Sequence, residues 1–289
     1  MWLKRTLPGL LAVVTALGGC GSVTVRPADV IVTNARNNSS GAELSGAPLS
    51  EAAGLGKKQA SISAVGTPYG DIHVATALST PASDALIVFC GGNGFQERYA
   101  GATRGAALAP FGDILMFDYP GLGQSGGSGA ANEYQNFRQS LGAYIAELVQ
   151  AKGYGEVIFW GHSFGSGFCS ALAADHKGHS RLVLEAGFGS LMEVARARAG
   201  AAANVVQIEI DPAVPQYEVR DLLRGYSGQV VSIASRADEV IPFAVSQALA
   251  NDLESANGDV TVLLLPEGTH ARLWATSGYG QALERALGR

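Results

Sequence analysis

The sequence has few cysteines and no long run of positive charge, and both absences exclude classes of protein. Three cysteines occur among 289 residues, and no Cys-x-x-Cys or His-x-x-x-His spacing is present to hold a structural metal ion. No run of Lys and Arg is longer than two, and the formal net charge is −5. The chain therefore lacks the basic field that attracts nucleic acid. We expect no metal ion, no cofactor and no nucleic-acid partner.

The chain also lacks an apolar run of about 20 residues, which a membrane-spanning helix needs. Its first apolar run is shorter, follows Lys4 and Arg5, and ends in Leu17-Gly18-Gly19-Cys20. A positive start, a short apolar centre and small residues before a cleavage site are typical of a secretory signal. This pattern predicts a signal peptide over residues 1–19.

The Leu-Gly-Gly-Cys segment resembles the lipobox of bacterial lipoproteins. In that family the cysteine becomes the first mature residue and carries lipid, so the resemblance implies that Cys20 anchors the protein to a membrane of the bacterial cell envelope. Gly21 and Ser22 directly follow Cys20, and neither is an acidic residue that would suggest retention at the inner membrane. We therefore expect the outer membrane, with the protein facing the periplasm. A plain secretory peptide cleaved near Gly19 is the alternative.

The two remaining cysteines, Cys90 and Cys169, each lie in an apolar run. A buried free cysteine behaves as a small apolar side chain, so we expect two core thiols. An oxidising compartment would also allow a disulfide.

Two regions follow the predicted signal. Residues 20–56 lack sustained periodicity and include a polar stretch of small residues at 34–41, which predicts a lipid-anchored linker. Residues 57–289 have the hydrophobic content of a folded domain, and the whole chain is 47% hydrophobic. We expect this second region to be a single catalytic domain.

Within that domain, a hairpin signal precedes a series of strands and helices. Residues 61–65 and 71–77 flank Thr67-Pro68-Tyr69-Gly70, which indicates a turn. Short, wholly apolar runs typical of strands buried on both faces follow at 85–90, 113–118, 156–160, 181–184, 229–233 and 260–265. Helices are predicted at 132–152 (with Asn132 as N-cap), 166–174, 242–253 and 279–287. This alternation predicts an α/β fold with a mostly parallel sheet, an antiparallel N-terminal hairpin and helices on both faces.

The segment Gly161-His162-Ser163-Phe164-Gly165 lies between a predicted strand and a predicted helix. This is the required context of the Gly-x-Ser-x-Gly nucleophile elbow, in which a sharp turn projects the serine above the sheet. Flanking glycines are needed because the strand and helix approach the turn closely.

Together with other segments, this elbow resembles the alpha/beta-hydrolase superfamily over residues 61–289. Phe89 to Phe95 is similar to the oxyanion-hole loop, residues 117–125 to the Asp-x-x-Gly-x-Gly-x-Ser segment, residues 236–242 to the acid segment, and Gly268-Thr269-His270 to the terminal histidine loop. The nearest branch is the serine-aminopeptidase-like and monoglyceride-lipase-like one. The resemblance implies an alpha/beta-hydrolase fold with a small lid at about 189–228. Within this range, residues 190–205 predict an amphipathic helix, and residues 208–215, which include two prolines, predict an irregular stretch.

The resemblance assigns a role to each site residue. Ser163 is the nucleophile, His270 the general base and Asp238 the acid that orients the imidazole. The backbone N–H groups of Phe164 and Asn93 stabilise the oxyanion. The expected substrate is a small molecule with an acyl bond, an ester or thioester before an amide.

Other polar side chains have structural interpretations. His73 lies in the predicted hairpin, far from the strand tips, and His176 and His179 lie in a polar loop at the opposite end of the sheet. Asp118 is expected to bind loop backbone.

Several alternatives remain open. Glu185 and Glu239 compete with Asp238 for the acid role, although Glu185 also fits a structural partner beneath the site and Glu239 a solvated neighbour. Four side chains are candidates to line an acyl pocket or to form the lid core: Phe95, Phe188, Leu191 and Met192. A non-catalytic binding lipoprotein and an acyltransferase would use the same fold, and the sequence makes no prediction of oligomeric state.

Overall fold

A single mixed sheet forms the centre of the computed structural model, which describes residues 22–34, 46–256 and 259–288. Its eight strands lie in the order β10-β9-β7-β6-β4-β5-β3-β2. The strands are β2 (Gln59–Val65), β3 (Ile72–Leu78), β4 (Ala85–Cys90), β5 (Asp113–Phe117), β6 (Glu156–His162), β7 (Ser180–Glu185), β9 (Val230–Ser235) and β10 (Val260–Leu265). Only the β2–β3 and β3–β5 pairings are antiparallel. The predicted hairpin and the parallel strands that follow it are confirmed.

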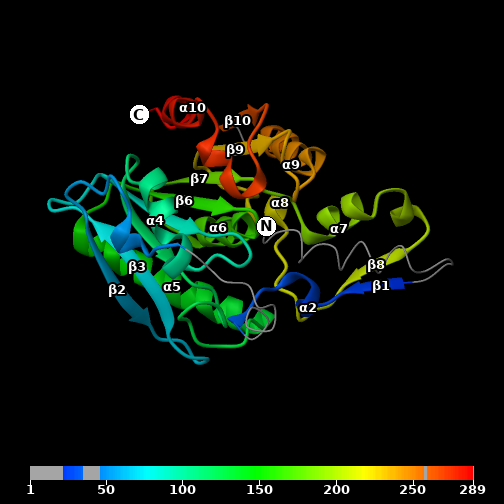
Figure 1. Cartoon of the computed structure of the whole chain (residues 1–289), viewed down its shortest axis with the longest axis horizontal. Coiled ribbons are helices and arrows are strands. Elements are labelled where there is room, and N and C mark those ends of the chain that lie inside the picture. The colour runs from blue at the N-terminus through cyan, green and yellow to red at the C-terminus, as the bar shows by residue number, and fades with distance from the viewer. Residues whose placement is uncertain (1–21, 35–45, 257–258, 289) are drawn as a thin grey trace.

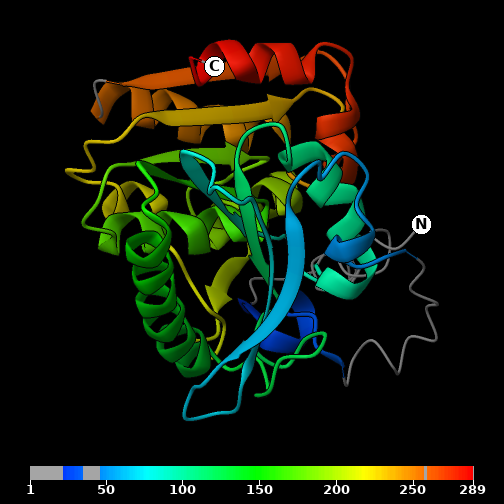
Figure 2. The ribbon, with the colours of Figure 1, turned by 90° about the vertical axis from the view of Figure 1, so that its left-hand side faces the viewer.

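Helices cover both faces of this sheet (Figures 1 and 2). They are α4 (Glu97–Leu108), α5 (Ala131–Lys152), α6 (Phe164–Asp175), α8 (Val219–Leu222), α9 (Phe243–Ala256) and α10 (Tyr279–Ala286). The apolar side chains of α5, α6 and α9 pack with one face of the strands. Those of α4 and α10 pack with the other face. Within the described ranges, no helix is both long and apolar enough to cross a membrane.

The region expected to be a lid contains more regular structure than the sequence predicts. A helix was expected near its start, and α7 (Leu191–Ala199) begins after Ser190, whose hydroxyl accepts a hydrogen bond from the Glu193 N–H at 3.3 Å. The 3-10 helix η2 (Gly200–Asn204) follows. The stretch from Ile208 was expected to be irregular, but strand β8 (Gln207–Ile210) forms there because a partner strand is available.

That partner comes from the beginning of the chain. Strand β1 (Ser22–Val25) pairs in parallel with β8, and the short helix α2 (Pro27–Val30) follows it (Figure 1). A 3-10 helix, η1 (Leu49–Glu51), then packs against α4, and Leu49 is buried. The range predicted to be a linker therefore contains segments packed on the domain, and residues 35–45 of that range lie outside the described residues.

Two further expectations need correction. Cys90 and Cys169 are joined in a disulfide and are not free thiols, because the end of β4 and the inner side of α6 bring them together. Helix α5 starts at Ala131, so Asn132 lies inside its first turn and is not the N-cap. The Glu133 carboxylate accepts hydrogen bonds from the N–H groups of Gly129 and Ala130, and it thereby gives backbone donors at the start of the helix a partner.

Candidate active site

Ser163 occupies a strained turn between β6 and α6. Its φ of 55° and ψ of −121° lie where side-chain-bearing residues are seldom found. Such strain costs about 1–3 kcal/mol and is concentrated at functional sites. A Cβ at Gly165 would collide with the Cys90 carbonyl oxygen, and one at Gly161 would meet the start of α6. The two glycines are therefore required by close backbone approach, as the nucleophile-elbow interpretation predicts.

His270 and Asp238 form a buried pair. The His270 Nδ1 atom lies 2.8 Å from Asp238 Oδ2, and both side chains are almost wholly inaccessible to solvent. The other carboxylate oxygen, Oδ1, accepts hydrogen bonds of 2.8 Å from the N–H groups of Val240 and Ile241. Because Nδ1 contacts Asp238, Nε2 is the ring nitrogen that can accept a proton from a hydroxyl.

The structure brings the predicted nucleophile and the predicted base to one cavity. Ser163 and His270 both line a cavity of about 580 Å³. Among the described residues, the Ser163 hydroxyl makes no hydrogen bond to His270; such bonds are often long until substrate binds. The cavity size lies within the range of small-molecule sites.

The predicted oxyanion loop also reaches this cavity. Gly92 lies against the elbow, because a Cβ there would be 3.1 Å from His162 Cδ2 and 3.5 Å from Ser163 Cβ. Phe164 is the first residue of α6, where N–H groups lack helical partners. Phe164 and Asn93 both line the cavity, and their N–H groups stay the predicted oxyanion donors.

Glu185 lies beneath the site as an ion-pair partner. Its carboxylate is wholly buried and contacts Arg104 Nη2 at 2.7 Å, the Tyr279 hydroxyl at 3.2 Å and His162 Nδ1 at 3.3 Å. Burial alone would raise the pKa of this carboxyl group, but the Arg104 charge and the His162 contact outweigh it and lower the pKa of Glu185 to about 2. Glu185 is therefore ionised, and its charge is paired with Arg104 and not with His270.

His162 lies beside His270, with a distance of 4.8 Å between the centres of the two rings. Burial lowers the pKa of His162 from its ordinary 6.5 to about 4, although the Glu185 carboxylate opposes the shift. The ring is therefore neutral near pH 7. It thus places no positive charge next to the His270 ring.

Two contacts at the site were not predicted from the sequence. Glu239 is exposed, as expected of a solvated neighbour, and its carboxylate also accepts a 3.0 Å hydrogen bond from the His270 N–H. Its position next to Asp238 was the only available signal. Nothing in the sequence indicated the role of Arg104, because Glu185, with which it pairs, lies 81 residues further along the chain.

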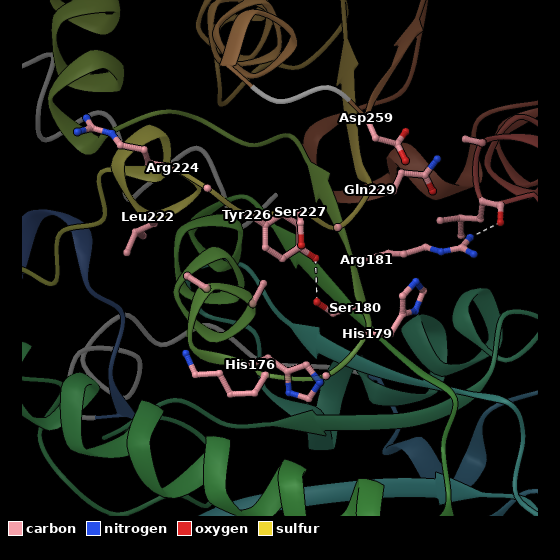
Figure 3. A pocket seen from close by; sticks show the side chains of 18 of the residues that line it. His176, His179, Ser180, Arg181, Leu222, Arg224, Tyr226, Ser227, Gln229 and Asp259 are labelled. Atoms are coloured by element: carbon pink, nitrogen blue, oxygen red, sulfur yellow. Dashed lines mark hydrogen bonds between the residues drawn. The ribbon is translucent and has the colours of Figure 1, made fainter.

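The remaining histidines lie elsewhere. His176 and His179 line a second cavity, of about 740 Å³, beside the amino ends of β7, β9 and β10 (Figure 3). Their predicted place at the wrong end of the sheet is therefore confirmed. His73 was expected to be far from the strand tips, but β3 runs antiparallel and brings its carbonyl to the Asp118 N–H, just after β5. There His73 pairs with Glu97 at 3.3 Å.

Asp118 has the structural role that the sequence predicts. Its carboxylate accepts hydrogen bonds from the N–H groups of Glu97 at 2.7 Å and Gln124 at 2.9 Å. It therefore fixes loop backbone and is not available as the catalytic acid.

A nucleophile elbow on a mostly parallel sheet, with a histidine–aspartate pair at the same cavity, defines the alpha/beta-hydrolase fold, and comparisons agree. A family model described as alpha/beta hydrolase fold matches residues 106–232. This range includes the elbow and ends before Asp238 and His270. A search of curated proteins finds no match to the sequence.

Solved structures of similar fold include enzymes of different kinds. An esterase from Pyrococcus furiosus superposes with a TM-score of 0.60 and 14% identity, over 81% of this chain and 89% of that one. A putative hydrolase from Agrobacterium vitis gives 0.51 and 19%, over 79% and 98%. An acylaminoacyl peptidase from Pyrococcus horikoshii gives 0.57 and 11%, over 80% of this chain and 40% of that one. At these identities the likeness shows the fold alone.

Proposed function

We propose that this chain is a serine hydrolase that cleaves an acyl bond, with carboxylic esters as its main substrates. The observation that carries the proposal is the buried 2.8 Å contact of His270 and Asp238 at the cavity that also holds Ser163 in its strained turn. Serine is a weak nucleophile until a base takes its proton, and this arrangement supplies one.

The proposed reaction has two halves. The Ser163 hydroxyl attacks the acyl carbonyl while His270 Nε2 takes its proton, and the N–H groups of Phe164 and Asn93 stabilise the oxyanion. Collapse breaks the bond to the leaving alcohol, which receives the proton from His270. Water, deprotonated by His270, then attacks the acyl-enzyme and releases the acid. Asp238 holds the imidazole in one tautomer throughout.

The cavity favours an acyl chain over a charged group. Phe95, Phe188 and Leu191 line it, as the sequence suggested, while Met192 is not among the lining residues. Its other apolar walls include Ile241 and Trp274. Apolar walls with a few convergent polar groups are typical of small-molecule sites.

Reaction with a fluorophosphonate probe tests the proposal. We expect an adduct on Ser163 of the purified full-length protein, absent in Ser163→Ala and reduced at least about 10³-fold in rate in His270→Ala. His176→Ala is the matched control, because His176 lies at the other end of the sheet, and it should react like wild type. Folded wild-type protein that forms no adduct would favour the binding-protein alternative. Transfer of the acyl group to an added alcohol in preference to water would favour the acyltransferase.

We also propose that lipid on Cys20 holds the enzyme at the outer membrane, facing the periplasm. The signal pattern that ends at Cys20 supports this proposal. The Cys90–Cys169 disulfide supports it independently, because disulfides persist in oxidising compartments such as the periplasm.

A further inference from the structure

The catalytic cavity has a wall that lies outside the expected catalytic domain. Residues 29–32 line the cavity together with Ser163 and His270, although they are about 130 and 240 residues away in the chain. Ile31 and Val32 are buried, with 3% and 7% of their surfaces exposed. This N-terminal wall, defined as residues 29–32, faces a cavity whose lid side contributes Phe188, Leu191 and Val194.

Asn93 fastens the N-terminal wall to the oxyanion loop. Its side-chain Oδ1 accepts a hydrogen bond from the Val32 N–H at 3.0 Å, and its Nδ2 donates to the Val30 carbonyl. One amide therefore satisfies a donor and an acceptor of the same backbone segment, as a neighbouring strand would. The oxyanion loop and the wall are fixed relative to each other by this single side chain.

Two more attachments hold the segment at its ends. After the wall, the Asn34 side chain donates to the Gly123 carbonyl at 2.8 Å and accepts from the Gly123 N–H at 3.0 Å. Before it, β1 pairs with β8 of the lid region (Figure 1). The N-terminal wall is thus tied to the lid, to the oxyanion loop and to the loop after β5.

We propose that the N-terminal wall sets the acyl-chain preference of the enzyme, and that Asn93 acts through its side chain as the positioning residue that holds this wall. The substrate class is an ester with an apolar acyl chain long enough to reach past Ser163 to Ile31. This inference rests on the proposed hydrolase function and deepens it. Each methylene buried against such a wall is worth about fourfold in kcat/KM.

The test compares p-nitrophenyl octanoate with p-nitrophenyl acetate in the full-length protein. For Ile31→Ala we expect the octanoate-to-acetate ratio of kcat/KM to fall about tenfold. Ile62→Ala is the matched control, because Ile62 is exposed on β2 and does not line the cavity. It should keep the wild-type ratio. Equal ratios in the two variants would overturn the proposal.

A second pair of variants tests the positioning role of Asn93. Asn93→Ala should lower the same ratio, mainly by raising KM for octanoate, because the wall loses its attachment. Asn136→Ala removes an asparagine whose amide donates to the Asn132 carbonyl within α5 and which does not line the cavity, and it should keep the wild-type ratio. A fall in kcat with both esters and no change in their ratio would show a general loss of the loop and contradict the positioning role.

A measurement on wild-type protein covers the case in which variants fail to fold. Exchange of the Val32 N–H with solvent deuterium reports on the wall, because this N–H donates its hydrogen bond to Asn93 Oδ1. An octyl fluorophosphonate on Ser163 should slow this exchange about threefold or more relative to an ethyl fluorophosphonate, because its chain packs on the wall. Equal rates would overturn the inference. Failure of both probes to label Ser163 would instead overturn the proposed function.

Discussion

At the scale of single residues, the site keeps two neighbouring histidines in different environments. His270 has Asp238 on its Nδ1 atom, whereas His162 is buried over Glu185, whose charge is already shared with Arg104. The sequence predicts the role of His270 from its place after the last strand. It could not predict the electrostatic role of His162, because the Arg104–Glu185 pair beneath it is formed between distant segments.

This environment predicts a dependence of stability on pH. The pKa of His162 is about 4 in the folded state and near 6.5 when unfolded, so the unfolded chain binds more protons between these values. The contribution of the neutral ring is present above pH 6.5 and is lost as pH falls toward 4. Between pH 7 and pH 5, wild type should lose about 2 kcal/mol more unfolding free energy than His162→Gln.

Urea unfolding of both proteins at the two pH values measures this difference. His179→Gln is the control, because the His179 side chain is 66% exposed and its removal should leave the wild-type pH dependence unchanged. The same loss of stability in wild type and His162→Gln would contradict the argument.

At the scale of elements, strands with a strong local pattern were predictable and elements made by distant contacts were not. The run at 85–90 is apolar throughout and forms β4 at the expected bounds. By contrast, β1 and β8 have four residues each and form by pairing with each other, although they lie far apart in the sequence. The sequence of helix α4 has little apolar periodicity, because Gly101 and Gly105 occupy its packed side. These residues are small so that η1 can approach, and a Cβ at Gly101 would meet the Leu49 backbone.

The disulfide is another element-scale contact, and it predicts a loss of stability when removed. It joins β4 to α6 across a separation of 79 residues, for which loop-closure entropy gives about 4.5 kcal/mol. The double variant Cys90→Ala/Cys169→Ala should unfold at lower urea concentration by that free energy. Dithiothreitol should destabilise wild type and leave the double variant unchanged, and equal stability of the two oxidised proteins would contradict the prediction.

At the scale of the whole molecule, the proposed anchor has a geometric consequence. Cys20 precedes Ser22, the first residue of β1, by two positions, and two extended residues span about 7 Å at most. Lipid on Cys20 would therefore hold the β1–β8 ribbon, and the lid region with it, close to the membrane surface. Residues 22–34 of the range predicted to be a linker are packed on the domain and do not act as a free spacer.

The anchor itself is tested by metabolic labelling with palmitate. Wild type should be labelled and recovered with membranes, whereas Cys20→Ser should lose about all of the label, because the thiol is the attachment point. Cys169→Ser is a control for the loss of a cysteine as such, and it should stay labelled. Equal labelling of wild type and Cys20→Ser would remove the lipid anchor.

The sequence by itself determined the α/β order of elements and the candidates Ser163, Asp238 and His270. These follow from local signals: apolar runs, turn glycines and the place of each residue after a strand. Only the tertiary structure decided the disulfide, the Arg104–Glu185 pair, the Glu239 contact with His270 and the N-terminal wall. Each of these joins segments whose residues carry no local mark of their partners, so the contact exists only once the sheet has brought the segments together.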